Sequence, residues 1–177
     1  MRAYMKSSMP YLGVPVPEVR RITNAAARVH SPASASALAA TGRLLWRRAE
    51  FREERYASTA LTGLQIAHGR LELLPLYEEM ITVGAWWDHV DEVAHRIGSL
   101  LIAHPDRMRP LLQRWAVDQD RWLRRTSIIA QLGAKRLTDI ELLERVITAN
   151  VGDPDRFIRK AIGWALRDYA RTEPAWV

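Results

Sequence analysis

The stretch WWDHVDEVAHRIGSLLIA, residues 86–103, decides the fold class, because its apolar residues return every three or four positions. Residues at that spacing share one face of an α-helix. The face predicted to be buried is apolar and consists of Trp86, Val90, Val93, Ala94, Ile97 and Leu101. Trp87 and Asp91 lie four residues apart and therefore occupy one side of the helix together, at the edge of that face. The simpler interpretation of the pair is a tryptophan at the rim of the core beside a solvated aspartate.

The same helical period continues through the rest of the chain, and no segment shows the alternation of a strand. Turn residues interrupt it at roughly every 15–20 positions. Helices are predicted over residues 16–29, 34–48, 51–67, 71–82, 86–103, 105–117, 121–133, 138–149 and 155–171. Antiparallel helix pairs that repeat at roughly 35–40 residues indicate an all-α solenoid of the HEAT-like or armadillo type. A compact helical bundle is the alternative, although the chain lacks long heptad repeats.

The composition sets the broad class of protein. The 177 residues, 48% of them hydrophobic, suit a single domain spanning 1–177. No run of eighteen uncharged apolar residues is present, so no membrane partner is expected. The lack of cysteine excludes disulfides and thiol nucleophiles, and it indicates an intracellular, cytoplasmic protein. The five histidines show no metal-ligand spacing and no glycine-rich phosphate loop occurs, so we expect neither a metal nor another cofactor.

Positive charge makes a polyanionic partner plausible. The net charge is +6 and the isoelectric point is about 10.1. Residues 1–70 contain 11 basic and 4 acidic side chains, residues 71–103 contain 1 and 6, and residues 104–177 contain 14 and 10. An acidic centre is thus flanked by basic segments. Only three of the 26 basic residues are lysine, which a GC-rich genome also produces, so the charge alone favours nucleic acid only modestly.

The last predicted helix carries a basic stripe. Its members, at steps of four, four, three and four residues, are Arg156, Lys160, Trp164, Arg167 and Arg171. Cations around an indole suit a phosphate backbone approached by an aromatic ring, and we assign the stripe to DNA contact; a solvated face is the alternative. Arg124 and Arg125 lie near the start of another predicted helix, where free backbone N–H groups and the helix dipole also favour an anion.

Four segments together match a known family: MRAYMKSSMPYLGVPVPEVRRIT (1–23), WWDHVDEVA (86–94), RWLRRTSIIAQL (121–132) and DRFIRKAIGWALRDYARTEPAWV (155–177). They resemble the bacterial DNA alkylation-repair glycosylases of the AlkD type. The strings WWDxVD and FIRKAIGWALRxYA are long and specific. The region around 30–80 is similar mainly in its helix pattern. The family also carries an additional helix before the AYM segment and a short helical tail after EPxWV, so we expect this chain to lack both end helices.

The resemblance implies a curved HEAT-like solenoid whose basic concave face holds duplex DNA. It implies a monofunctional, monomeric glycosylase that excises N3-methyladenine and N7-methylguanine without flipping the base into a pocket, and that is nucleoid-associated when bound to DNA. By motif match, the catalytic positions fall on Trp87, Asp91 and Trp164. Arg125 falls on the phosphate-binding arginine, with Arg124 beside it, and Tyr4 of the AYM segment is placed near the lesion.

The residue types agree with that chemistry. A cationic alkylated purine is already a good leaving group, and positive charge builds on the deoxyribose as the glycosidic bond breaks. A fixed carboxylate such as Asp91 stabilises that charge, and the indoles of Trp87 and Trp164 add cation–π attraction of about 0.5–2 kcal/mol each. We expect these side chains and Arg125 to converge on one groove from three helices.

Two other functions fit parts of the sequence. A catalytically silent DNA-binding relative would explain the basic stripe but not a carboxylate that faces DNA. A HEAT-type scaffold for protein interactions would explain the helices but not the basic, tryptophan-bearing set.

Overall fold

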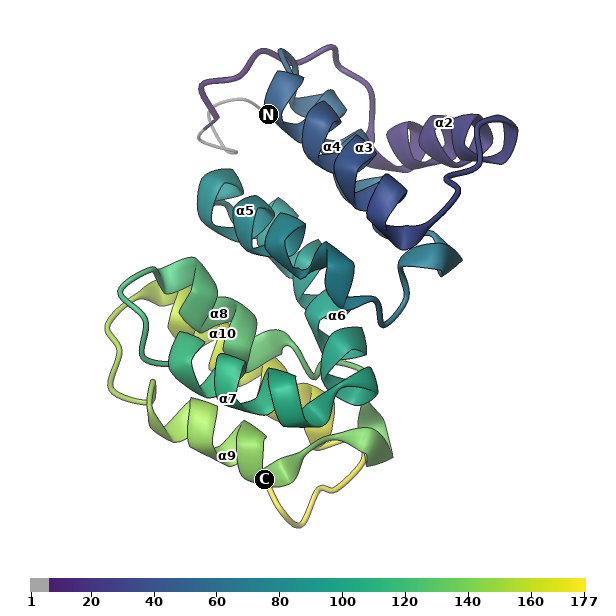
Figure 1. Ribbon diagram of the computed structural model, residues 1–177. Helices are drawn as coiled ribbons and strands as arrows, with labels where there is room; N and C mark the ends of the chain where they lie inside the picture. The colour runs from purple at the N-terminus through teal and green to yellow at the C-terminus, as the bar shows by residue number, and fades with distance from the viewer. Residues whose placement is uncertain (1–6) are drawn as a thin grey trace. The chain divides into compact units, whose positions relative to one another are not determined.

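The computed structural model describes residues 7–177, and every regular element in this range is a helix (Figure 1). The predicted all-α fold is confirmed. Nine α-helices and three short 3-10 helices lie within the described range. The chain divides into two compact units, the first ending at Met80 and the second running from Ile81 to Val177. None of the described helices combines the length and the apolar character needed to cross a membrane.

The first unit is built around α4, which packs against both α2 and α3. Its helices, the last of which continues past Met80, are α2 (Val16–Val29), α3 (Ala35–Arg48), α4 (Arg52–Leu61), η1 (Gln65–Ala67), η2 (Leu71–Leu73) and α5 (Leu74–Gly84). Pro15 and Pro17 open α2, because a helix leaves its first N–H groups unbonded and proline has none to lose.

A buried carboxylate fixes the segment before α2. Glu53 of α4 accepts hydrogen bonds from the backbone N–H groups of Leu12 at 3.0 Å, Gly13 at 2.9 Å and Val14 at 3.3 Å. Gly13 has a φ of +86°, a conformation that glycine adopts without steric cost. The three bonds compensate for taking the charge of Glu53 out of water.

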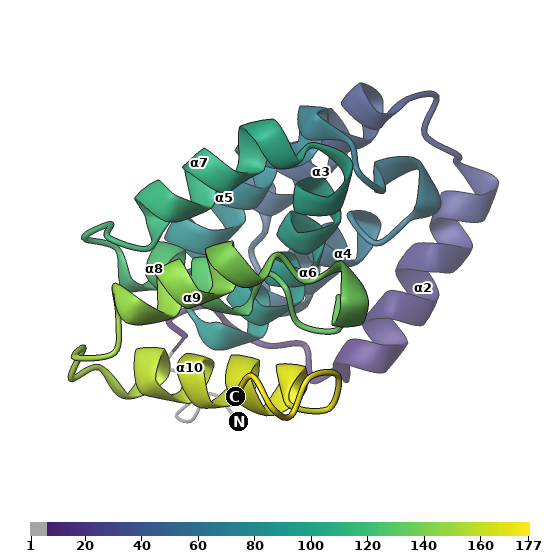
Figure 2. The same ribbon diagram turned by 90° about the horizontal axis from the view of Figure 1, so that it is seen from below.

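The second unit is a two-layer stack of helices. Its elements are α6 (Trp87–Ala103), α7 (Pro105–Trp115), α8 (Arg121–Ile129), η3 (Lys135–Leu137), α9 (Ile140–Thr148) and α10 (Arg156–Tyr169). Helix α8 packs between α6 and α10, while α7 and α9 pack against each other and against α8 (Figures 1 and 2). Alternate helices therefore share a layer, which is the arrangement expected of stacked helix pairs.

Aspartates begin three helices of this unit. The Asp120 side chain accepts from the Trp122 N–H at 2.7 Å before α8, and Asp155 accepts from the Phe157 N–H at 2.7 Å before α10. Before α9 the capping residue is Asp139, which accepts from the Leu142 N–H at 3.0 Å. An aspartate suits this position because its short side chain reaches the free N–H groups of the first turn.

Helices α6 and α8 approach each other very closely at Gly98. A Cβ atom built on Gly98 would lie 2.1 Å from the backbone oxygen of Ala130, which follows α8. The predicted buried face of α6 is confirmed from Val90 to Leu101, whereas Trp86 at its start is only half-buried. The lack of a side chain at Gly98 thus sets the spacing of the two helices that carry the candidate site.

Candidate active site

An aromatic cluster joins the first turns of α6, α8 and α10. The ring of Trp86 lies 5.9 Å from that of Trp122 and 5.4 Å from that of Phe157, and the Trp122 and Phe157 rings are 5.0 Å apart. The two contacts of Trp86 are edge-to-face, an arrangement that aromatic quadrupoles favour. Because each ring stands at the start of a different helix, the cluster brings the three N-terminal turns together.

Asp91 forms a two-pronged ion pair with Arg125 beside this cluster. The Nε of Arg125 donates to Oδ1 of Asp91 at 2.7 Å, and Nη2 donates to Oδ2 at 2.8 Å. Only 6% of the Arg125 side chain and 18% of the Asp91 side chain are exposed. The parallel pair of bonds fixes the plane of the carboxylate as well as its position.

The same guanidinium also reaches α10. Nη1 of Arg125 donates to the backbone oxygen of Phe157 at 2.6 Å, so Asp91, Arg125 and Phe157 form one hydrogen-bonded chain across α6, α8 and α10. A guanidinium has five N–H groups, and three of those on Arg125 are used in these bonds. The predicted phosphate contact of Arg125 stays a prediction; the side chain is only 6% exposed and its remaining two N–H groups are largely covered.

The two candidate catalytic tryptophans lie on α6 and α10, the helices on either side of α8. Trp87 is the first residue of α6 and is half-buried, one helical turn before Asp91. Trp164 of α10 is 37% exposed and lies two turns beyond Phe157. Both therefore belong to helices that the Asp91–Arg125–Phe157 chain connects, and Trp164 leaves much of its indole open to a ligand.

The basic stripe of α10 is exposed along its length. Arg156, Lys160 and Arg167 are all solvent-exposed, and the Arg156 guanidinium lies 4.8 Å from the centre of the Phe157 ring. Positions four, three and four residues apart face one way on a helix. This row of cations follows one side of α10, with Trp164 in the middle.

Arg124 was predicted to contact DNA, but four of its five N–H groups donate hydrogen bonds within the protein. It donates to Asp153 at 3.2 and 3.0 Å, to the Asp118 oxygen at 2.7 Å and to the Gln119 oxygen at 3.0 Å. These bonds hold the loop before α8 against the loop before α10 and leave one N–H for a phosphate. The predicted role of Tyr4 falls outside the described residues.

A second ion pair strengthens the start of α10. Burial alone would raise the pKa of Asp155, but the Phe157 backbone N–H and the Arg121 guanidinium, 3.0 Å away, hold that pKa below its usual value. Asp155 thus combines the roles of helix cap and ion-pair partner.

The histidines and acids of the described chain form no metal site. Within residues 7–177, no group of three or more His, Cys, Asp or Glu side chains is placed to hold a metal ion. His89 is fully buried in α6, whereas His30, His68 and His95 are exposed.

Sequence reasoning missed Phe157 and Asp153. Phe157 matters through its backbone oxygen as well as its ring, and a backbone oxygen has no signature in the letters of a sequence. Asp153 could have been noticed as a carboxylate in the loop just before the basic helix, where it takes Arg124 as its partner.

We expect Arg125→Gln to lower the free energy of unfolding by about 2–3 kcal/mol, as measured by urea denaturation. Removal of one partner from a buried pair typically costs more, but Asp91 keeps some contact with water. Arg121→Gln breaks a more exposed pair, in which the Arg121 side chain is half exposed, and should cost less than about 1 kcal/mol. Equal losses for the two variants would contradict a special role for the Asp91–Arg125 pair.

The comparisons with known proteins agree with this architecture. The family model of DNA alkylation repair enzymes matches residues 1–177. A solved structure described as a predicted DNA alkylation repair enzyme from Enterococcus faecalis is similar over 99% of this chain and 82% of that chain, with 27% identity and a TM-score of 0.76. No curated protein matches the chain. The all-helical fold and the match over the full length show that this chain belongs to the DNA alkylation repair enzyme family.

Proposed function

We propose that this protein is a DNA glycosylase that removes cationic alkylated purines, such as N3-methyladenine and N7-methylguanine, from duplex DNA. The observation that carries the proposal is the Asp91 carboxylate, held by two hydrogen bonds from Arg125, which also bonds to the first turn of α10, the helix that carries the exposed basic stripe. A carboxylate among phosphate-binding cations weakens DNA binding, so its presence there is best explained by a role in the catalysed reaction.

The proposed reaction is hydrolysis of the N-glycosidic bond. The bond between C1′ of the deoxyribose and the purine nitrogen breaks, and its electron pair leaves with the base, which thereby loses its positive charge. Positive charge appears on the sugar, where Asp91 stabilises it. A water oxygen then bonds to C1′ and its proton passes to Asp91 or to solvent. Because the base leaves as a neutral molecule, it needs no general acid; we propose that it also leaves without being flipped into a pocket.

Arg125 orients the carboxylate in this scheme. Each carboxylate oxygen has about two acceptor positions, and Arg125 takes one on each oxygen. The remaining positions of Asp91 are available to the sugar and the attacking water. A fixed group that requires no reorganisation during the reaction stabilises a transition state better than a mobile one.

Trp87 and Trp164 supply the aromatic faces for the cationic sugar, and Arg156, Lys160 and Arg167 hold the phosphates. Cation–π contacts of about 0.5–2 kcal/mol favour the charged transition state over the neutral sugar. Phosphate contacts fix the position of the duplex without reading its sequence. This division of roles supports recognition of a lesion by its charge rather than by its shape.

The direct test is release of methylated bases from duplex DNA treated with a methylating agent, followed by chromatography. We expect release of N3-methyladenine and N7-methylguanine and none of the unmodified bases. Binding of the duplex without release would instead support a catalytically silent DNA-binding protein. Failure to bind duplex DNA at low salt would favour a scaffold for protein interactions.

The affinity for duplex DNA should fall steeply with salt. With about four phosphate contacts from the stripe, we expect a loss of roughly 10²-fold between 50 and 200 mM salt, because each contact releases condensed counterions. Fluorescence anisotropy of a labelled duplex over a salt series measures this slope. An affinity that does not change over this range would argue against the basic stripe as the binding surface.

A further inference from the structure

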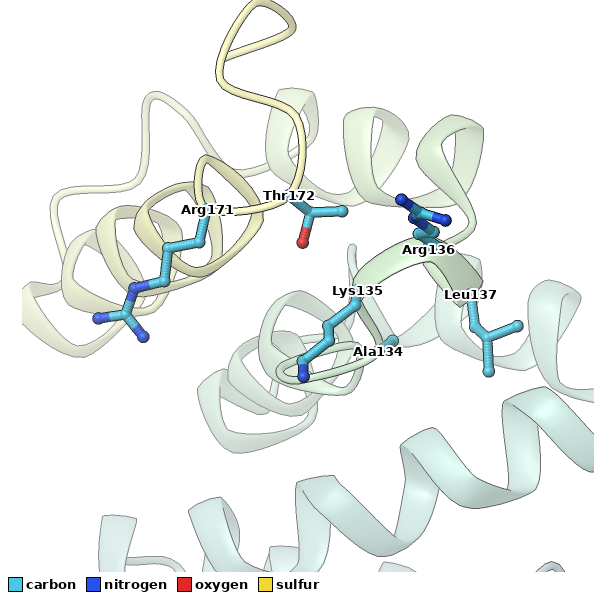
Figure 3. Close-up of a pocket in the computed structure, with 6 residues that line it drawn as sticks. All are labelled: Ala134, Lys135, Arg136, Leu137, Arg171 and Thr172. Atoms are coloured by element: carbon cyan, nitrogen blue, oxygen red, sulfur yellow. The ribbon is translucent and has the colours of Figure 1, made fainter.

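A depression lined by three cations lies at the far end of α10 from the aromatic cluster. It has a volume of about 440 Å³, and the residues around it are Ala134, Lys135, Arg136, Leu137, Arg171 and Thr172 (Figure 3). The first four come from η3 and the residue before it, and the last two from the turn after α10. Both segments belong to the second unit of the chain.

The cations of this depression have no acidic partner among the described residues. Lys135 and Arg171 are exposed, and Figure 3 shows their side chains extending in the same direction. Other arginines of the unit, such as Arg109, Arg121 and Arg145, each pair with a carboxylate. Asp168 is the acid bonded beside the depression, where it accepts from the Gly133 N–H at 2.7 Å, and within residues 7–177 no ion pair joins the three cations to a carboxylate.

Lys135 occupies a backbone conformation that does not suit a lysine. Its φ is +53°, in the left-handed region that glycine adopts readily and that other residues rarely enter. A glycine at this position would therefore make the turn at least as stable as the lysine does. Strained residues of this kind gather at functional sites.

The depression continues the basic stripe. Arg171 stands seven residues after Trp164, in the turn that follows α10, and at about 1.5 Å per residue it lies about 10 Å further along. Successive phosphates of one DNA strand advance about 3.4 Å along the duplex. For a duplex whose axis follows α10, the depression would be about three base pairs from the position of Trp164.

We propose that the duplex axis follows α10 and that Lys135 and Arg171 bind a backbone phosphate about three or four base pairs from the sugar under attack. This inference rests on the proposed function, because that function places the lesion at Trp164 and Asp91. The Thr172 hydroxyl on the wall of the depression can donate a further hydrogen bond to the phosphate. Such a contact fixes the register of the duplex on α10 on one side of the lesion only.

The test uses fluorescein-labelled duplexes that contain one tetrahydrofuran abasic-site analogue. One duplex has eight base pairs on each side of the analogue, and two others are trimmed to two base pairs on one side or the other. Lys135→Gly and Arg171→Gln are compared with Arg114→Gln, which removes an exposed arginine of α7 outside the stripe. Lys135→Gly relieves the left-handed backbone, so its melting temperature should equal or exceed that of the parent.

We expect Lys135→Gly and Arg171→Gln each to reduce the slope of log affinity against log salt by about 1, as the loss of one phosphate contact does. The difference from the parent should disappear on one of the two trimmed duplexes and persist on the other. Slopes equal to that of Arg114→Gln, or losses that are the same on all three duplexes, would overturn the proposal.

Base release by the unchanged protein is measured in parallel. It distinguishes failure of the glycosylase proposal from failure of the phosphate site at Lys135 and Arg171. If the protein releases no methylated base but the loss still depends on one arm of the duplex, the phosphate site stands and the glycosylase proposal fails. If base release is observed and the loss does not depend on either arm, only the phosphate site is overturned.

Discussion

Asp91→Asn is expected to lower the rate of base release about 10²–10³-fold, the effect of removing one preorganised electrostatic group from an active site. Asparagine has nearly the same shape and can still accept a hydrogen bond from Arg125, but it carries no negative charge to meet the charge on the sugar. Affinity for duplex DNA should stay the same or rise, because one repulsion of the phosphates is lost. Single-turnover release of N7-methylguanine and binding of the same duplex measure the two quantities.

Glu92→Gln is the matched control for this variant. Glu92 is the next residue of α6 and pairs with Arg96 at 2.7 Å, one turn along the same helix. The pair is partly buried, so its loss costs somewhat more than the about 0.3–0.5 kcal/mol of an exposed pair at this spacing, but the variant should still fold and release base as the parent does. Equal rates for Asp91→Asn and the parent would remove the carboxylate from the mechanism.

Gly98→Ala is expected to destabilise the protein by about 3 kcal/mol or more. The added methyl group would lie 2.1 Å from the backbone oxygen of Ala130, and a backbone atom cannot turn aside as a flexible side chain can. Insertion of a methylene group into a packed core typically costs about 1–3 kcal/mol, and here two helices must move apart. Urea denaturation followed by circular dichroism gives the change in free energy.

Gly163→Ala provides the opposite case in the same unit. Gly163 lies within α10, and nothing stands within 4 Å of a Cβ atom built there. Alanine is the better helix former, so this variant should be more stable by about 0.5–1 kcal/mol. If Gly98→Ala were as stable as Gly163→Ala, the close approach of α6 and α8 would not determine their spacing.

The positions of the helices could be predicted closely from the sequence, because apolar period and capping residues are local signals. The prediction for residues 16–29 matches α2 at both ends, and α6 begins one residue after its predicted start. The helix predicted over 51–67 is wrong in its second half, since α4 ends at Leu61 and only a short 3-10 turn follows. Its apolar pattern continues through Thr62 and Gly63, where the backbone leaves the helix.

The site was predictable only in part. The spacing of Trp87 and Asp91 places both on one side of α6, and the spacing within α10 predicts its exposed basic side. The partner of Asp91 was not predictable, because Arg125 lies 34 residues away and several neighbouring arginines have the same chemistry. Only packing decides that Arg125 turns to Asp91 while Arg124 turns to Asp153.

The aromatic cluster also provides an optical reporter of this region. Trp122 is buried among rings, so its emission lies at shorter wavelength, whereas Trp164 and Trp176, each 37% exposed, emit further to the red. A nucleobase stacked on Trp164 would quench part of the red emission and leave the blue part unchanged. Unfolding would instead shift the blue part to the red, so a single fluorescence spectrum distinguishes a bound ligand from a damaged fold.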